Sequence, residues 1–298
     1  MLLQAMEQWP VTSGLTVSPL GPAGAEITGL DLGKPFDLAT EDALRQAMAE
    51  HRVLVFRDQA MSPADQIRLL GLFGNVLDES TNGSRFTYVS GDESGIKAGR
   101  LLFHSDNHFT PRPIEYLSLY AESVDDRAAS TLYVDSVAGL QRLAPEIAAR
   151  LEGARAVSVT YYFWGQSSDR PARSITPERP EAPRAVHPVI WRHPASGERF
   201  AYITELHTHH LEGMPLEESD RLLAEVHKAL YPADGIYEHR WRTGDLLVWD
   251  NRAAQHARGY VPDSRGDPTA PKRSLRRVAV GPVNFRDQIK LETLGVAG

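Results

Sequence analysis

The stretch GDLLVWDNRAAQH, residues 244–256, is an apolar run of strand length followed by a turn that ends in a histidine. A short apolar run bounded by turn residues is typical of a buried β-strand. Strand-like runs recur along the chain, as LTVSPL (15–20), AEITGLDL (25–32), VLVF (53–56), 116–121, 131–135, 156–162, FAYIT (200–204), YEHRW (237–241), LLVWD (246–250) and RSLRRVAVG (273–281). Few helical segments separate them. The pattern predicts a mainly β fold with helical cover, specifically a double-stranded β-helix, the jelly roll.

Helix signals are fewer than strand signals. Helices are predicted from Thr40 to about His51, from Ser62-Pro63 to about Phe73, near 137–151, and from about Leu216 to Leu230. The polar stretches 76–100 and 163–184 read as long loops, and loops of that length are commonly functional, so both are expected beside an active site. Residues 1–14 read as a loose leader. We expect residues 1–298 to form one domain.

Composition excludes several classes of function. The 39 acidic residues exceed the 32 Lys and Arg, for a net charge of −7, which argues against a nucleic-acid partner. The absence of cysteine excludes disulfides and thiolate metal sites, so any metal would be held by His, Asp or Glu. No apolar run approaches 18 residues and the first residues do not resemble a signal peptide, so a cytoplasmic protein with no membrane partner is expected.

The candidate metal ligands lie far apart in the sequence. His104 and Asp106 are two residues apart, and in a strand such residues point to the same face. Alone, this short motif also fits a surface turn. His256, which follows the strand at 246–250, completes a set of two histidines and one carboxylate. That set suits non-haem Fe(II), because it leaves coordination positions open for other ligands.

Three arginines follow in one predicted strand. Alternation places Arg273 and Arg277 on one face and Arg276 on the other, although the choice among them depends on strand register. Guanidinium groups that point into a barrel require anions, because an unpaired buried charge is costly. Arginine is also suited to bidentate capture of a carboxylate. The sequence therefore predicts a basic pocket for an acidic co-substrate close to the metal site.

Taken together, these motifs resemble the TauD/TfdA family of Fe(II)- and 2-oxoglutarate-dependent dioxygenases, from roughly Leu15 to Pro282. The resemblance implies that His104, Asp106 and His256 bind iron, and that the enzyme consumes O2 and 2-oxoglutarate. It further implies that Thr131 and Arg273 hold 2-oxoglutarate and that Arg277 meets an anionic group of the substrate. The reaction that the resemblance implies oxidises, most often hydroxylates, a C–H bond of a small carboxylate or sulfonate, and releases succinate and CO2.

The chain also departs from the family pattern. Ala128-Ala129-Ser130-Thr131 stands where Gly-Gly-Asp-Thr is usual, Phe103 stands where Trp is frequent, and the interval from His256 to Arg273 is unusually long. Desaturation or another oxidation in natural-product biosynthesis stays open. So does a different class, a cupin-like barrel that binds a metal or small acid without redox turnover, although the paired arginines argue against it.

Further residues are candidates for the substrate pocket. Arg100 and Tyr162 are expected to contact substrate, with the run 161–164 forming either core or pocket wall. The histidines at 207, 209 and 210 are expected to have a structural or pocket role, because adjacent strand residues face opposite ways and could not all bind one metal. A homo-oligomer, dimer or tetramer, is expected.

Overall fold

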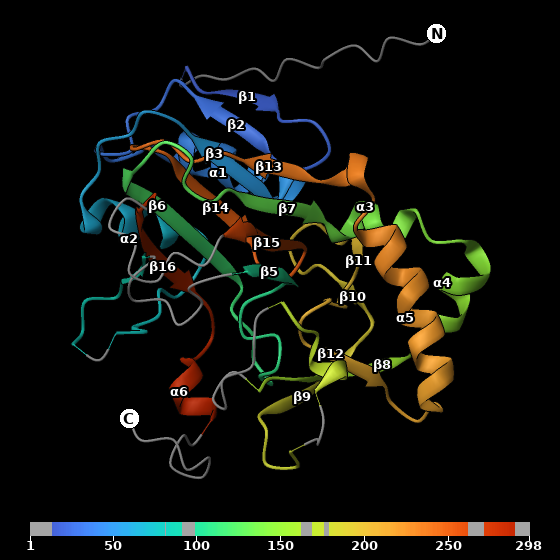
Figure 1. Ribbon diagram of the computed structural model, residues 1–298. Helices are drawn as coiled ribbons and strands as arrows, with labels where there is room; N and C mark the ends of the chain where they lie inside the picture. The colour runs from blue at the N-terminus through green and yellow to red at the C-terminus, as the bar shows by residue number, and fades with distance from the viewer. Residues whose placement is uncertain are drawn as a thin grey trace, which may run out of the picture.

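The computed structural model describes residues 14–80, 82–90, 99–161, 169–175, 179–261 and 271–289 (Figure 1). Its larger sheet contains, in spatial order, β1 (Thr16–Pro19), β2 (Ala25–Thr28), β3 (Val53–Phe56), β14 (Leu246–Asp250), β6 (Tyr116–Val124), β16 (Arg273–Val280) and β4 (Thr87–Ser90). A four-stranded sheet contains β13 (Tyr237–His239), β7 (Thr131–Asp135), β15 (Ala254–Val261) and β5 (Gly99–His104). The chain is therefore mainly β, as its sequence predicts.

Smaller β elements and helices surround these two sheets. The remaining strands form the sheet β12 (Thr208–Leu211), β8 (Arg155–Val159), β9 (Arg184–Pro188), and the hairpin β10 (Ile190–Arg192), β11 (Arg199–Ala201). The helices are α1 (Leu38–His51), α2 (Pro63–Leu70), α3 (Ser136–Gln141), α4 (Pro145–Leu151), α5 (Leu216–Leu230) and α6 (Phe285–Gln288), with 3-10 turns η2 (Ala172–Ser174) and η3 (Ala233–Gly235). In Figure 1, α3, α4 and α5 gather on one side of the molecule.

The central strand β14 is buried on both faces, and its side chains divide between two layers. Leu246 and Val248 pack in the cluster that includes α1 and α2, which cover the outer face of the larger sheet. Leu247 and Trp249 lie in a second cluster, which contains Tyr133 of the smaller sheet. Because alternate strand residues point to opposite faces, this second cluster lies between the two sheets. The interior between the sheets is where the candidate site is found.

The helix boundaries differ in part from the sequence-based expectation, and α2 ends at Leu70 and not at about Phe73. The first helix begins at Leu38 and not at Thr40, because the Asp37 side chain caps it by accepting a hydrogen bond from the Thr40 amide at 2.8 Å. The predicted helical stretch 137–151 is two helices, α3 and α4. Pro145 occupies the first turn of α4, where its missing N–H costs no helical hydrogen bond. The helix predicted at 216–230 is confirmed.

The prediction of one long loop over residues 76–100 is wrong in part. It contains β4, which pairs with β16, and β5 begins at Gly99. β4 is a four-residue edge strand with Tyr88 exposed, so it lacks the apolar run that signals a buried strand. In the stretch 163–184 the described residues include η2 and the first residue of β9. The predicted leader falls outside the described residues, except for Gly14.

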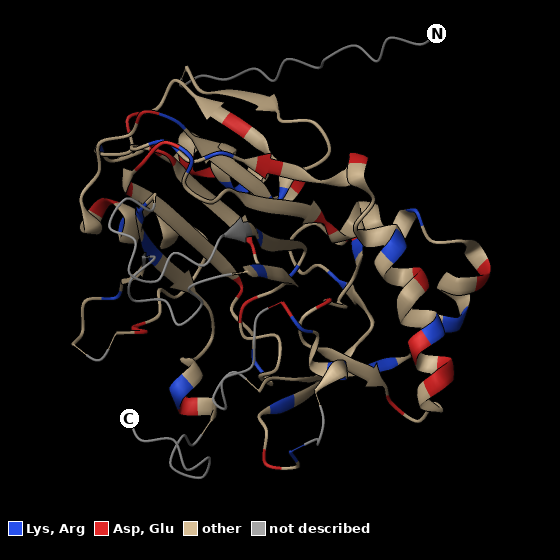
Figure 2. Cartoon of the chain, viewed as in Figure 1, with Lys and Arg blue, Asp and Glu red and all other residues tan. Residues whose placement is uncertain are grey.

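Charged residues are found on the outer helices and loops as well as on several strands (Figure 2). Figure 2 shows acidic and basic residues interspersed along α4 and α5, so neither helix carries a stripe of a single sign. Among the described residues, no helix combines the length and apolar character needed to cross a bilayer.

Candidate functional site

His104 and His256 face each other across two neighbouring strands. They are directly opposed in the ladder between β5 and β15, with ring centroids 4.2 Å apart, and both are largely buried. The Nδ1 atom of His104 lies 2.9 Å from the Leu102 carbonyl oxygen. Because a carbonyl can only accept, Nδ1 carries the proton and the lone pair is on Nε2. That tautomer directs a free nitrogen towards His256 and Asp106, as a metal ligand requires.

Asp106 completes the cluster from a loop. The expectation that His104 and Asp106 converge as alternate residues of one strand is wrong, because β5 ends at His104. The chain instead turns after Asp106, where Asn107 adopts a φ of 58°. Asp106 Oδ1 lies 3.2 Å from the Nε2 atom of His104 and 3.5 Å from that of His256. The turn therefore brings the carboxylate to the two imidazoles.

Asn251, the first residue after β14, holds the backbone of Asp106 on both sides. Its Oδ1 accepts from the Asp106 amide at 2.8 Å, and its Nδ2 donates to the Asp106 carbonyl at 3.0 Å. Nδ2 also donates to the carbonyl of Ile114 at 2.9 Å, and Asn251 is fully buried. Two of the candidate ligands are thus fixed by strand pairing, and the Asn251 side chain fixes the third. Asn251 is part of the sequence motif WDNR, but nothing in the sequence indicated that its side chain would hold the backbone of Asp106.

We expect Asn251→Ala to weaken metal binding by about 10- to 100-fold, the range typical of groups that orient metal ligands. The cause is that Asp106 loses both backbone anchors. Titration with Mn(II), followed by electron paramagnetic resonance, measures the effect. Asn75→Ala is the matched control, since the Asn75 amide also donates to a carbonyl, that of Gly281 at 3.3 Å. A variant that is destabilised but binds Mn(II) normally would show that Asn251 is only structural.

The donor atoms of His104, Asp106 and His256 lie within 4.8 Å of one another. Two imidazole nitrogens and one carboxylate oxygen form the set that Fe(II) oxygenases use, so these residues fit a bound iron ion. Burial would raise the pKa of Asp106, but its interactions with the neighbouring His104 and His256 outweigh burial, so the pKa is lowered. Burial and the neighbouring His104 lower the pKa of His256 to about 3. Asp106 therefore offers an anionic donor, and His256 offers a neutral one.

Arg277 lies against the carboxylate of Asp106. Its Nη2 donates to Asp106 Oδ2 at 2.9 Å, and its Nη1 forms an ion pair with Glu79. Burial lowers the pKa of Arg277 to about 10. Strand alternation predicted the position of Arg277, but no pattern predicted Glu79. It lies in the segment between α2 and β4, where no periodicity indicates which way a side chain points.

Arg273 lies on the same strand face as Arg277, as alternation predicts. Its Nη1 donates to the Ala129 carbonyl, and burial followed by the charge of Arg258 lowers its pKa to about 10. Arg276 is on the opposite face, where its Nε donates to Gln66 of α2 at 2.8 Å. The structure thus separates the two interior arginines from the one that joins β16 to α2.

Thr131 and two residues missed by sequence analysis line the same interior face. In the ladder between β7 and β15, Tyr133 opposes His256 and Arg258 opposes Thr131. Opposed residues of antiparallel strands share a face, so all four side chains point the same way. The Thr131 Oγ1 atom accepts from Trp241 Nε1 at 3.0 Å, which leaves its own hydroxyl hydrogen available to donate. Strand alternation from His256 would have identified Arg258.

The other predicted pocket residues have different outcomes. Arg100 is exposed at the start of β5, where its charge acts on Glu205, and Tyr162 lies outside the described residues. His207 is buried beside the cluster, its ring centroid 6.1 Å from that of His104. Burial, and then the neighbouring His104, lower the pKa of His207 to about 3, so it is neutral near pH 7. It forms part of the wall of the site.

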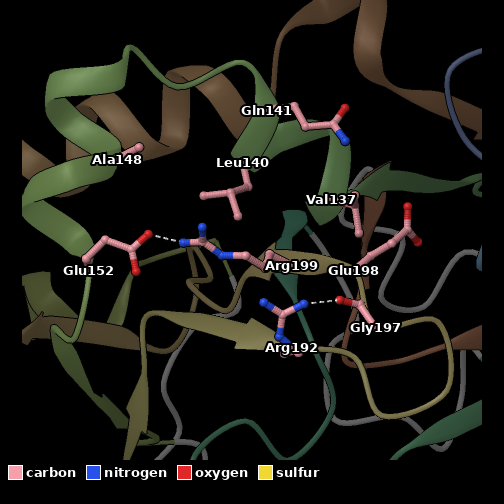
Figure 3. Close-up of a pocket in the computed structure, with 9 residues that line it drawn as sticks. All are labelled: Val137, Leu140, Gln141, Ala148, Glu152, Arg192, Gly197, Glu198 and Arg199. Atoms are coloured by element: carbon pink, nitrogen blue, oxygen red, sulfur yellow. Dashed lines mark hydrogen bonds and ion pairs between the residues drawn. The ribbon is translucent and has the colours of Figure 1, made fainter.

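A separate cavity of about 420 Å³ lies between α3, α4 and the β10–β11 hairpin (Figure 3). None of the predicted site residues lines it. Its arginines are already bonded within the protein, Arg199 to Glu152, and Arg192 to the Gly197 carbonyl at 2.7 Å. Nothing in this cavity supports chemistry comparable to that of the histidine and aspartate cluster.

Comparison with known proteins gives consistent results. Residues 16–279 match the model of the family described as "Taurine catabolism dioxygenase TauD, TfdA family". The alpha-ketoglutarate-dependent 2,4-dichlorophenoxyacetate dioxygenase of Cupriavidus pinatubonensis (strain JMP 134 / LMG 1197) is 30% identical over 80% of this chain and 88% of its own. The alpha-ketoglutarate-dependent sulfate ester dioxygenase of Pseudomonas putida is 28% identical over 97% of this chain and 98% of its own.

Solved structures of other proteins have a similar fold. The crystal structure of AAD-2 in complex with Mn(II) and N-oxalylglycine has a TM-score of 0.74 at 25% identity, covering 91% of this chain and 98% of that one. A taurine dioxygenase from Burkholderia xenovorans has a TM-score of 0.72 at 21% identity, covering 90% of this chain and 89% of that one.

Proposed function

Because the chain belongs to the Taurine catabolism dioxygenase TauD, TfdA family, we propose that His104, Asp106 and His256 hold the iron of the reaction. The protein is a 2-oxoglutarate-dependent non-haem iron dioxygenase, and it uses O2. The observation that carries the ligand assignment is the convergence of three donor atoms within 4.8 Å. Iron and 2-oxoglutarate, when bound, supply the oxidising chemistry, which yields succinate and CO2 as a substrate C–H bond is oxidised. The protein's own residues bind and orient the reactants.

Arg273 and Thr131 are proposed to hold the distal carboxylate of 2-oxoglutarate. Arg273 supplies a buried cation, and a carboxylate would relieve the cost that burial and Arg258 impose on its charge. Thr131 supplies a neutral donor, since its oxygen already accepts from Trp241. Arg273 shares the inner face of β16 with Arg277, and Thr131 lies on β7, which pairs with the strand that carries His256, so the co-substrate and the metal would share one interior.

The fold is proposed to be a double-stranded β-helix in a single domain. Support comes from the cluster between the sheets, which joins Leu117, Trp249 and Leu275 of the larger sheet to Tyr133 of the smaller one. Two sheets that bury their inner faces against each other form one core, and the candidate site lies within it.

We propose a small anionic substrate, bearing a carboxylate or a sulfonate, that meets Arg277. The names of the two relatives specify 2,4-dichlorophenoxyacetate and sulfate esters, which are acidic compounds. The net charge of −7 supports a small molecule over a nucleic acid. Because Glu79 already pairs with Arg277, an acidic substrate must share that guanidinium or displace the Glu79 carboxylate. Hydroxylation is the simplest outcome, and desaturation would use the same residues.

The function is tested by adding Fe(II) and 2-oxoglutarate to the purified protein without oxygen. We expect a visible charge-transfer band that forms only when both Fe(II) and 2-oxoglutarate are added. Under air, we expect the protein to release succinate with at least one acid from a panel of aryloxyacetates, alkyl sulfates and sulfonates. A His256→Ala variant, which lacks one ligand, should give no band. The absence of both the band and succinate release in the unmodified protein would contradict the proposal and favour a barrel that binds without turnover.

A further inference from the structure

Tyr133 carries a buried hydroxyl that has no role in the reaction proposed above. Its side chain is 0% exposed, and its Oη has no hydrogen-bond partner among the described residues. The ring packs edge-on against Trp249, with centroids 5.4 Å apart, and lies 6.2 Å from the ring of His256. Native proteins seldom leave a buried hydroxyl unpaired, because its lost hydration is not replaced. A ligand at this position would provide the missing partner.

The position of Tyr133 shows which ligand could do so. It opposes His256 across the strand pair and lies two residues after Thr131, so its side chain points into the interior that holds the metal ligands. The charges of Arg273 and Asp106 both act on the hydroxyl. Tyr133 therefore lies within electrostatic range of both the proposed co-substrate arginine and the proposed metal ligand.

We propose that the Tyr133 hydroxyl donates a hydrogen bond to a carboxylate oxygen of bound 2-oxoglutarate. The inference rests on the proposed function, because it assumes that the co-substrate lies beside Arg273 and Thr131. Burial raises the pKa of Tyr133 well above its ordinary value, so the hydroxyl keeps its proton and acts as a donor. A neutral donor suits this position, since Arg258 and Arg273 already place two positive charges nearby.

Tyr202 offers a matched control. It is 1% exposed, and its hydroxyl also has no hydrogen-bond partner in the described part of the chain. Its ring packs against Trp191, with centroids 4.5 Å apart, and against His108 at 4.1 Å. The charged groups that act on it are Arg252 and Asp250, and not Arg273. Removing its hydroxyl therefore tests the loss of a buried phenol OH without touching the proposed co-substrate position.

The experiment compares the unmodified protein with Tyr133→Phe and Tyr202→Phe, each loaded with Mn(II) and titrated calorimetrically with 2-oxoglutarate and N-oxalylglycine. We expect Tyr133→Phe to raise both dissociation constants about tenfold or more, the effect of losing a hydrogen bond to a charged group. Tyr202→Phe should leave them unchanged. Thermal melting without ligand should show Tyr133→Phe at least as stable as the unmodified protein, because no bond is lost.

Each other result would count against the proposal in a distinct way. Dissociation constants for Tyr133→Phe within twofold of the unmodified protein would overturn the role of the hydroxyl while leaving the proposed function intact. Equal weakening in both variants would assign the effect to general loosening of the core, and would also overturn it. If the unmodified protein bound neither compound in the presence of Mn(II), the proposed function itself would fail.

Discussion

Asp106→Ala is expected to abolish succinate formation and to weaken metal binding by more than about 100-fold. The substitution removes the only anionic donor among the three proposed ligands, and even groups that merely orient ligands are worth about 10- to 100-fold. The loop should keep its position, because Asn251 holds residue 106 through its backbone amide and carbonyl. Arg277 would lose its bond to Asp106 but keep its ion pair with Glu79.

The measurement combines the Mn(II) dissociation constant with the rate of succinate release, and circular dichroism checks that the variant is folded. Asp220→Ala is a suitable control, because the Asp220 carboxylate is half exposed and pairs with Arg173 on the surface at 3.1 Å. A folded Asp106→Ala protein that retains its metal and turns over would remove Asp106 from the ligand set.

Arg273→Ala is expected to raise the dissociation constant for 2-oxoglutarate by about 100-fold or more. Truncating one partner of a buried charge pair costs roughly 2–5 kcal/mol, because the remaining charge is left in a poorly hydrated interior. The affinity for Mn(II) should change little, since Arg273 contacts none of the three proposed ligands in the described hydrogen bonds. Arg273→Lys should recover only part of the affinity, because lysine cannot donate in the bidentate geometry.

Calorimetric titration of the Mn(II)-loaded variants with 2-oxoglutarate measures this effect. Lys272→Ala, one residue away and exposed, controls for a general loss of positive charge. Should Arg277→Ala weaken 2-oxoglutarate binding while Arg273→Ala does not, the roles of the two arginines would be exchanged. Unchanged affinity in both variants would place the co-substrate elsewhere.

The sequence predicts those strands and helices whose apolar residues repeat at a regular interval. The strand at 246–250 and the helix at 216–230 were predictable, because a buried strand and an amphipathic helix impose a repeating apolar pattern. β4 was not, since an exposed edge strand imposes no such pattern. The exact start of α1 depends on the cap of Asp37, and several nearby polar residues could have served as that cap.

The candidate site, too, could be predicted only in part. The residue types at 104, 106 and 256 were enough to identify a candidate metal site, because few side chains bind iron. The way in which Asp106 reaches the histidines was not predictable, since it depends on a turn and on Asn251, which is 145 positions distant. Tyr133 and Glu79 were missed because tyrosine and glutamate are common residues, and only their burial beside the site distinguishes them.

The pairing of β5 with β15 has a consequence for the folding of the protein. This ladder contains two register shifts, both on the side of the His104–His256 pair that leads towards Gly99. A slip of one residue would turn one histidine to the opposite face of the sheet. An ion bonded to both imidazoles permits only the register in which they are opposed. In a chain without cysteine, metal binding would thus do what a disulfide does in secreted proteins and cross-link two strands that the sheet alone pairs irregularly.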